Sequence, residues 1–270
     1  MSSMDIANVT LETFKKLFST GQRFDLRKLD EYRNIELGFD VSNCAEGSAR
    51  VKIGKTEVIV GVKMNLDAPY PDSPDKGNIM VSAELLPLAS PRFEHGPPKF
   101  EGIELPRLVD RAIRESGVIQ LDKLVVTPGE KVWTVIIDIY PINDDGNLID
   151  AATIGAIAAL RKAKLPGITE KNTPDYKKRT NKSLPLNANI PLSISFYKLG
   201  NSIYLDPTRE EEEATDVKVT WGISDWNGKM MIHSCQKSGK ITFTQSEIES
   251  MMNLIEKKYL ELNAKLKKLI

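Results

Sequence analysis

Three arginines in the middle of this chain have the spacing of one helix face. At about 100° per residue, Arg107, Arg111 and Arg114 fall within roughly 60° of one another, and apolar residues fill the opposite side. A guanidinium group can donate two parallel hydrogen bonds to a phosphate, so one-turn spacing suits a polyanion. The alternative is a solvated face that pairs with Asp110 and Glu115. The residues alone leave both interpretations open.

A second segment has the predicted turn and helix start of an anion-binding site, but it lacks the charged side chains that such a site needs. Asp145 and Gly146 predict a turn, and an apolar, alanine-rich helix is expected over 151–163. A helix N-terminus attracts anions. A reactive site would need a cation or a hydroxyl beside the turn, however, and this stretch offers mostly small apolar side chains. Together, the two segments suggest a protein that binds a polyanion while a partner performs the reaction.

An acidic run lies later in the chain, over 206–216. Clustered carboxylates can bind magnesium or act as general acids, and a solvated turn between strands is the alternative. Asp216 directly precedes a strand pattern, so it is the one carboxylate singled out as a candidate. The acidic residues of the run, set against the single basic residue Arg209, are Asp206, Glu210, Glu211, Glu212, Glu213 and Asp216.

The remaining composition argues against several kinds of site. His95 and His233 are the only histidines, and Cys44 and Cys235 form no CxxC pattern, so neither a metal site nor a Ser-His-Asp triad is expected. We predict no cofactor. The 37 basic and 37 acidic side chains cancel, so a polyanion site has to come from local segregation of charge. The polar N-terminus and the lack of a long apolar run predict a cytoplasmic protein with no membrane span.

The predicted elements alternate in type along the chain. This order favours an α+β architecture, with mixed sheets and helices packed on them. A segment rich in lysine, arginine and proline, over 161–182, is predicted to be an exposed linker. Helices are expected at 8–18, 103–117, 151–163 and 245–269, and strands at 35–41, 49–53, 56–64, 79–88, 132–140, 190–199, 202–205, 216–223, 230–235 and 240–243.

Several of these residues together resemble the ribonuclease PH family. Residues 46–62 are similar to that family's early Gly-Ser-Ala and Gly-x-Thr-x-Val signature, and residues 205–212 are similar to its later acidic element. The resemblance covers roughly residues 20–260. Residues 104–111 and 131–135 are typical of the non-catalytic branch found in the archaeal exosome. The resemblance implies a ribonuclease PH-like fold with two βαβα-type halves.

The division of the chain that we expect follows from this resemblance. It has an N-terminal helix and extension over 1–30, a ribonuclease PH-like core domain over 31–168, a basic linker over 169–188 and a C-terminal ribonuclease PH-like domain over 189–270.

The resemblance also implies roles for the three arginines and for residues 150–154. In the catalytic branch an Asp-Gly-Gly-Thr-Arg segment holds inorganic phosphate, whereas the matching run here is 150–154, with Ile154 in place of the arginine. No catalytic residue is therefore expected, and Asp216 is interpreted as a vestigial acidic position. Arg107, Arg111 and, less strongly, Arg114 are implied to contact RNA.

The implied assembly is a hexameric ring of three heterodimers with a catalytic ribonuclease PH-like partner and RNA-binding cap proteins. Within it, single-stranded RNA is degraded from its 3′ end by phosphorolysis. Two rival hypotheses stay open from the sequence. One is an intrinsically active phosphate-dependent exoribonuclease that uses Asp216, and the other is a stand-alone RNA-binding protein.

Overall fold

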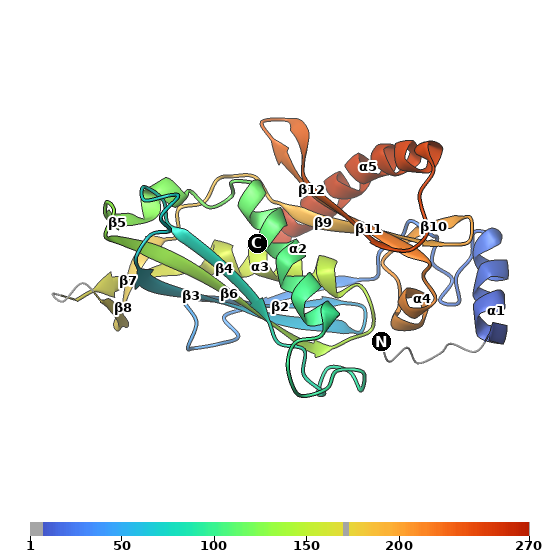
Figure 1. Ribbon diagram of the computed structural model, residues 1–270, viewed down its shortest axis with the longest axis horizontal. Coiled ribbons are helices and arrows are strands. Elements are labelled where there is room, and N and C mark those ends of the chain that lie inside the picture. Colours follow the sequence, from blue (N-terminus) through green and yellow to red (C-terminus); the bar gives the residue numbers. More distant parts are fainter. Residues whose placement is uncertain (1–7, 170–172, 270) are drawn as a thin grey trace.

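Two sheets enclose one helix in the computed structural model, which describes residues 8–169 and 173–269 (Figure 1). The larger sheet has the strand order β1-β2-β3-β6-β4, with β5 paired to β6. All its neighbours are antiparallel except β4 and β6, which run parallel. Its strands are β1 (Ile35–Phe39), β2 (Gly47–Ile53), β3 (Thr56–Asp67), β4 (Asn78–Ala83), β5 (Val125–Thr127) and β6 (Lys131–Asn143).

The second sheet is antiparallel throughout and has the order β10-β9-β11-β12. Helix α5 (Gln245–Leu269) packs on this sheet through apolar residues that include Met251, Ile255 and Leu262. No helix in the part of the chain that the structure describes is long and apolar enough to cross a membrane. The strands are β9 (Leu192–Leu199), β10 (Ser202–Leu205), β11 (Val217–Trp226) and β12 (Lys229–Gly239).

Helix α3 (Leu148–Lys162) lies between the two sheets, and every residue from Leu148 to Leu160 is buried. Its small side chains allow this close approach on all sides. A Cβ atom at Gly155 would lie 2.7 Å from a methyl carbon of Val60 on β3, a contact that no ordinary side chain tolerates. Helix α2 (Phe100–Glu115) packs beside α3 and against β4, and buries only one face.

The N-terminal helix α1 (Asn8–Ser19) belongs spatially to the second sheet. Phe14 and Phe18 on its apolar face pack in a small separate core with Tyr197 and Tyr204. The Phe18 and Tyr204 rings meet edge to face, with centroids 4.8 Å apart. A chain segment with three arginines, residues 20–34, then crosses to the first sheet.

The structure confirms the α+β class and corrects several element assignments. The segment predicted as an exposed linker over 161–182 contains regular structure, because β7 (Lys164–Ile168) and β8 (Pro174–Ser183) form an antiparallel hairpin. Helix α3 begins at residue 148, and the strand predicted at 79–88 ends at Ala83. The strand predicted at 240–243 is absent, since residues 240–241 form a bend. The short helices α4 (Arg209–Glu213) and η1 (Leu121–Leu124) were not predicted.

Candidate functional site

Helix α2 separates its apolar and basic faces as its sequence predicts. Leu105, Leu108, Val109, Ala112 and Ile113 are each less than 5% exposed. The three arginines are exposed on the opposite side. They border a shallow groove of about 380 Å³ between α2 and the edge strand β4. We call it the arginine groove; its lining residues are Met80, Val81, Pro106, Arg107, Asp110, Arg111 and Arg114.

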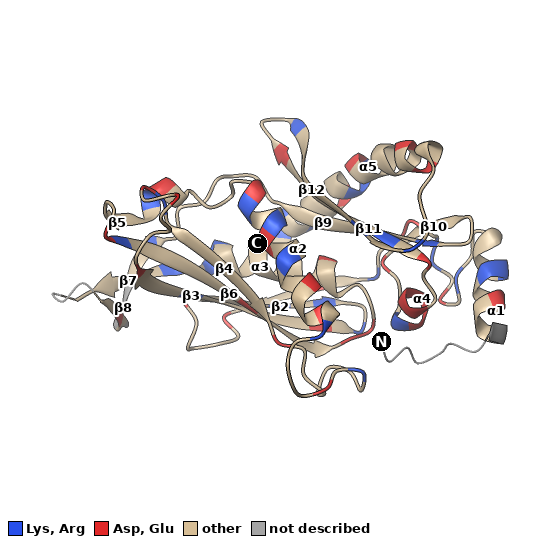
Figure 2. Cartoon of the chain, viewed as in Figure 1, with Lys and Arg blue, Asp and Glu red and all other residues tan. Residues whose placement is uncertain are grey.

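The three arginines differ in what they already bind. Arg114 donates to both carboxylate oxygens of Asp110, at 2.7 and 3.0 Å, and to the carbonyl oxygen of Ile79 at 3.0 Å. Arg107 and Arg111 make no hydrogen bond or ion pair with any residue that the structure describes. Figure 2 shows these basic positions along α2. Two guanidinium groups are thus open to a ligand, while the third is partly neutralised.

Carboxylates of the chain itself lie beside the start of α3. Asn147, in a left-handed conformation with φ 60°, precedes the helix. Its backbone N–H donates to Oε2 of Glu212 at 3.0 Å. Ile154, about two turns further along, is 1% exposed and belongs to the apolar core. A carboxylate of the protein itself therefore accepts a hydrogen bond at the helix N-terminus.

Asp206 is the centre of a buried ionic cluster beside this helix start. It is fully buried, and the Arg33 guanidinium binds its two oxygens at 2.8 and 2.9 Å. Arg27 donates to Asp206 at 3.1 Å and the Asn147 amide donates to it at 2.9 Å. A similar buried pair joins Arg23 to Glu211. Through these ion pairs, residues 20–34 hold the acidic run beside α3.

Asp150 forms a second buried polar centre on the first turn of α3. Tyr32 and Ser195 each donate a hydroxyl hydrogen bond to its carboxylate at 2.8 Å. Burial raises the pKa of Asp150 to about 7, although these hydrogen bonds act in the opposite direction. The hydroxyl of Ser195 also lies 2.9 Å from that of Thr220. The carboxyl group is held by the fold and has no exposed surface for a substrate.

The acidic run is organised differently from its sequence prediction. Most of it forms helix α4, which starts with a capping box between Thr208 and Glu211. Asp216 accepts a hydrogen bond from the backbone N–H of Gly200 at 2.8 Å and so braces the turn between β9 and β10. The carboxylates beside α3 are instead Asp206 and Glu212. Sequence reasoning had no local signal for choosing them, because their partners lie far away in the chain.

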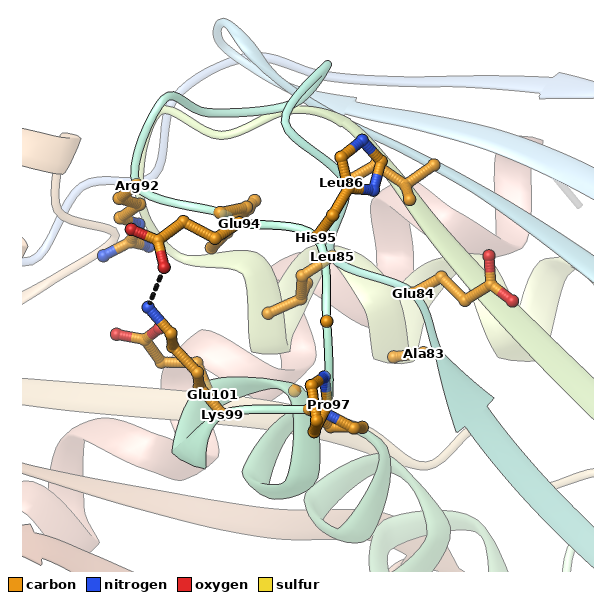
Figure 3. A pocket seen from close by; sticks show the side chains of 14 residues that line it. Ala83, Glu84, Leu85, Leu86, Arg92, Glu94, His95, Pro97, Lys99 and Glu101 are labelled. Carbon is orange, nitrogen blue, oxygen red and sulfur yellow. Dashed lines mark hydrogen bonds and ion pairs between the residues drawn. The ribbon is translucent and has the colours of Figure 1, made fainter.

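A further cavity of about 310 Å³ lies between residues 83–99 and the start of α2 (Figure 3). The ion pair between Glu94 and Lys99, 2.6 Å long, lies at its border. Leu85, Leu86 and Pro97 give it an apolar part. Within the described residues, no group of three or more histidine, cysteine, aspartate or glutamate side chains is placed to hold a metal ion. Cys44 and Cys235 are free and exposed.

Comparison with known proteins assigns both halves of the chain to one family. Residues 31–166 match domain 1 of the 3′ exoribonuclease family and residues 189–257 match its domain 2. The chain is 44% identical over 266 residues to the exosome complex component Rrp42 of Methanocella arvoryzae, with 98% of each chain covered. It is 41% identical to the protein of that name from Thermococcus onnurineus, covering 98% of this chain and 97% of the relative.

Solved structures agree with this relationship. A chain of the Archaeoglobus fulgidus exosome with RNA bound to the active site superposes with a TM-score of 0.87 at 40% identity, and the match covers 96% of this chain and 98% of that one. A chain of an archaeal exosome core gives a TM-score of 0.84 at 36% identity, covering 96% of this chain and 97% of that one. This chain therefore belongs to the 3′ exoribonuclease, or ribonuclease PH, family.

Proposed function

We propose that this chain is a non-catalytic, RNA-binding ring subunit of an archaeal exosome. In this proposal it alternates with a catalytic ribonuclease PH-like partner in a ring of three heterodimers, to which RNA-binding cap proteins attach. The ring degrades single-stranded RNA from its 3′ end by phosphorolysis. The names and structures of the relatives support the assembly, since they are exosome components and exosome cores. The two free, exposed cysteines fit a reducing, cytoplasmic setting.

The observation that carries the RNA-binding role is the pair of open guanidinium groups at the arginine groove. Arg107 and Arg111 are exposed, lie one helical turn apart and make no bond to a described residue. Each can donate two hydrogen bonds to one phosphate. Contacts of this kind bind the backbone and not the bases, so the expected affinity is sequence-tolerant and depends on salt.

The start of α3 supports the absence of catalysis. A phosphate dianion bound there would have to compete with the Glu212 carboxylate for the backbone N–H of Asn147, and like charges repel at short range. Ile154 offers neither a hydrogen-bond donor nor a charge, and it is enclosed by apolar neighbours. We therefore assign turnover to the partner and the RNA path to this chain.

The decisive experiment compares rings that contain different versions of this chain. With Arg107→Ala and Arg111→Ala together, we expect slower RNA degradation and weaker RNA binding at physiological salt, with the mass of the assembled ring unchanged. Lys16→Ala with Lys265→Ala is the matched control, because it also removes two exposed positive charges that lie outside the groove. Unchanged degradation in the arginine variant would refute the proposed role.

A second experiment separates the proposal from its rivals. The purified chain, given RNA and inorganic phosphate without a partner, is expected to release no nucleoside diphosphate. Release of that product would identify an active exoribonuclease. Size-exclusion chromatography with a catalytic partner is expected to show a shift to the mass of the ring, whereas a stand-alone RNA-binding protein would elute unchanged.

A further inference from the structure

The exposed face of α2 extends beyond the arginine groove, toward the start of the helix. Phe100 precedes Arg107 by seven residues and Arg111 by eleven, and α2 is continuous over all three positions. At about 100° per residue, both spacings return to within roughly 20° of the direction of Phe100. Ile103 lies within roughly 60° of that direction. The outer face of α2 therefore has an apolar first half and a basic second half.

The apolar half is not used by the fold. Phe100 is 65% exposed and Ile103 is 49% exposed. Neither belongs to the apolar core that the opposite face of α2 enters. The Phe100 ring makes no aromatic or cation–π contact with a described residue. Phe24, the other strongly exposed phenylalanine among the described residues, packs edge to face on Phe14 instead, with ring centroids 5.0 Å apart.

The first turn of α2, which carries Phe100, is in place before any ligand binds. The backbone N–H of Ile103 donates to the carbonyl oxygen of Lys99 at 3.2 Å. The side chain of Lys99 pairs with Glu94 at 2.6 Å and so joins the preceding loop to this turn (Figure 3). A phenylalanine side chain has few rotatable bonds, so binding through Phe100 orders little that the fold has not already ordered.

The order of groups along this face matches the parts of a nucleotide chain. Arg107 and Arg111 are separated by about 6 Å of axial rise, which is close to the separation of successive phosphates in an extended single strand. Phe100 lies about 10 Å before Arg107 along the same axis. A strand that runs along α2 with phosphates on both guanidinium groups would bring a neighbouring base to the ring. A protein segment would need acidic side chains at that same spacing, whereas a nucleic acid has charges at this spacing along its whole length.

We propose that Phe100 stacks against one base of a single-stranded RNA whose backbone lies on Arg107 and Arg111. This inference rests on the proposed RNA-binding role and adds a preference among bases to it. Every base can stack on an aromatic ring, and the strength of stacking sets the modest preferences of such sites. Purines have the larger ring system, so this position favours a purine, while the arginines bind the backbone of any sequence.

Equilibrium binding of labelled RNA to the full-length chain, measured by fluorescence anisotropy, tests this assignment. Phe100→Ala should weaken the binding of an oligoadenylate by about tenfold, and that of an oligouridylate by less. The slope of log affinity against log salt should not change, because no phosphate contact is lost. Phe100→Tyr keeps an aromatic ring and should bind like the unaltered chain. Phe24→Ala is the matched control, since it removes an exposed phenylalanine outside α2, and melting temperatures show that each variant is folded.

A strand of the same length whose nucleotides all lack bases separates stacking from backbone contacts. Phe100→Ala should bind this abasic strand as tightly as the unaltered chain does, because the ring has no base to stack against. The double variant Arg107→Ala and Arg111→Ala should weaken the binding of both strands. Equal losses with Phe100→Ala on the abasic strand and on the oligoadenylate would overturn the stacking assignment.

The same measurements separate failure of this inference from failure of the proposed function. If Phe100→Ala binds oligoadenylate normally while the double arginine variant binds it weakly, the stacking assignment is wrong and the RNA-binding role stands. If both variants bind it normally, both proposals are wrong. A Phe100→Ala chain that binds RNA normally but no longer assembles with a catalytic partner would identify the apolar half as a protein contact and would also overturn the assignment.

Discussion

The backbone N–H of Asn147 donates a hydrogen bond to the carboxylate of Glu212 across 65 residues of sequence, at 3.0 Å. A helix N-terminus normally attracts an anion through its unpaired N–H groups. Here the acidic run supplies that anion from within the chain. A phosphate ion that bound this N–H group would have to displace Glu212.

Restoring a cation at position 154 is therefore not expected to restore catalysis. Ile154→Arg places a charge in the apolar layer between the two sheets, and we expect it to lower the free energy of unfolding by at least about 3 kcal/mol. Urea denaturation measures this loss. Ile154→Val is the control, with an expected loss of about 1 kcal/mol. A stable Ile154→Arg protein that releases nucleoside diphosphates from RNA and phosphate would contradict our account of this segment.

The three arginines of the groove should contribute unequally to RNA binding. Arg107→Ala and Arg111→Ala should each reduce the slope of log affinity against log salt by about 0.7, the value for one phosphate contact on a single strand. Arg114→Ala should reduce it by less, because Asp110 already shares that charge. Fluorescence anisotropy with a labelled oligouridylate measures these slopes.

Asp110→Asn provides the converse test of the same ion pair. It removes the carboxylate that binds Arg114, so this variant should bind RNA more tightly and show a steeper salt dependence. An Asp110→Asn protein whose slope equals that of the unaltered chain would show that the Arg114 charge does not reach the RNA.

Local patterns in the sequence were enough to predict the arginine face. Helical periodicity depends only on spacing within a few turns, and the apolar residues opposite the arginines fix which face is buried. The alternation in β3 is equally local, with Val58, Val60, Val62 and Met64 all buried. The α+β class followed from the order of such elements.

Long-range pairing explains what the sequence did not reveal. Asp206 meets Arg33 across 173 residues, and no local pattern links them, so Asp216 was singled out instead. The lysine, arginine and proline content of residues 161–182 suggested an exposed linker without regular structure, yet most of this segment pairs as the hairpin of β7 and β8.

The cluster around Asp206 should dominate the attachment of the N-terminal segment. Asp206→Asn removes the buried charge that pairs with both Arg33 and Arg27, leaving them only their outer partners Asp145 and Asp25. We expect a loss of about 3–5 kcal/mol in the free energy of unfolding, the usual effect of breaking a buried ion pair. Asp122→Asn, on the exposed surface, should change it by less than about 0.5 kcal/mol. Similar urea midpoints for both variants would show that the cluster does not stabilise the attachment of the N-terminal segment.

Asp150 should make the stability of the fold depend on pH. Its pKa is raised to about 7 in the folded chain because the carboxyl group is buried, whereas an unfolded aspartate titrates near pH 4, roughly. Between these values the folded state binds more protons than the unfolded state. The stability that Asp150 contributes is therefore fully present below about pH 4 and is lost as the pH rises to about 7.

The variant Asp150→Asn isolates this contribution, since asparagine has the same shape as the neutral acid and does not titrate. The difference in unfolding free energy, unaltered chain minus variant, should fall by about 1.4 kcal/mol per pH unit between roughly pH 4 and 7, and should level off above that range. Urea denaturation at intervals of half a pH unit measures this difference. Asp216→Asn is the control, because the partner of Asp216 is the exposed backbone N–H of Gly200. A difference that is constant with pH would mean that Asp150 stays ionised in the fold, with Tyr32 and Ser195 offsetting the cost of its burial.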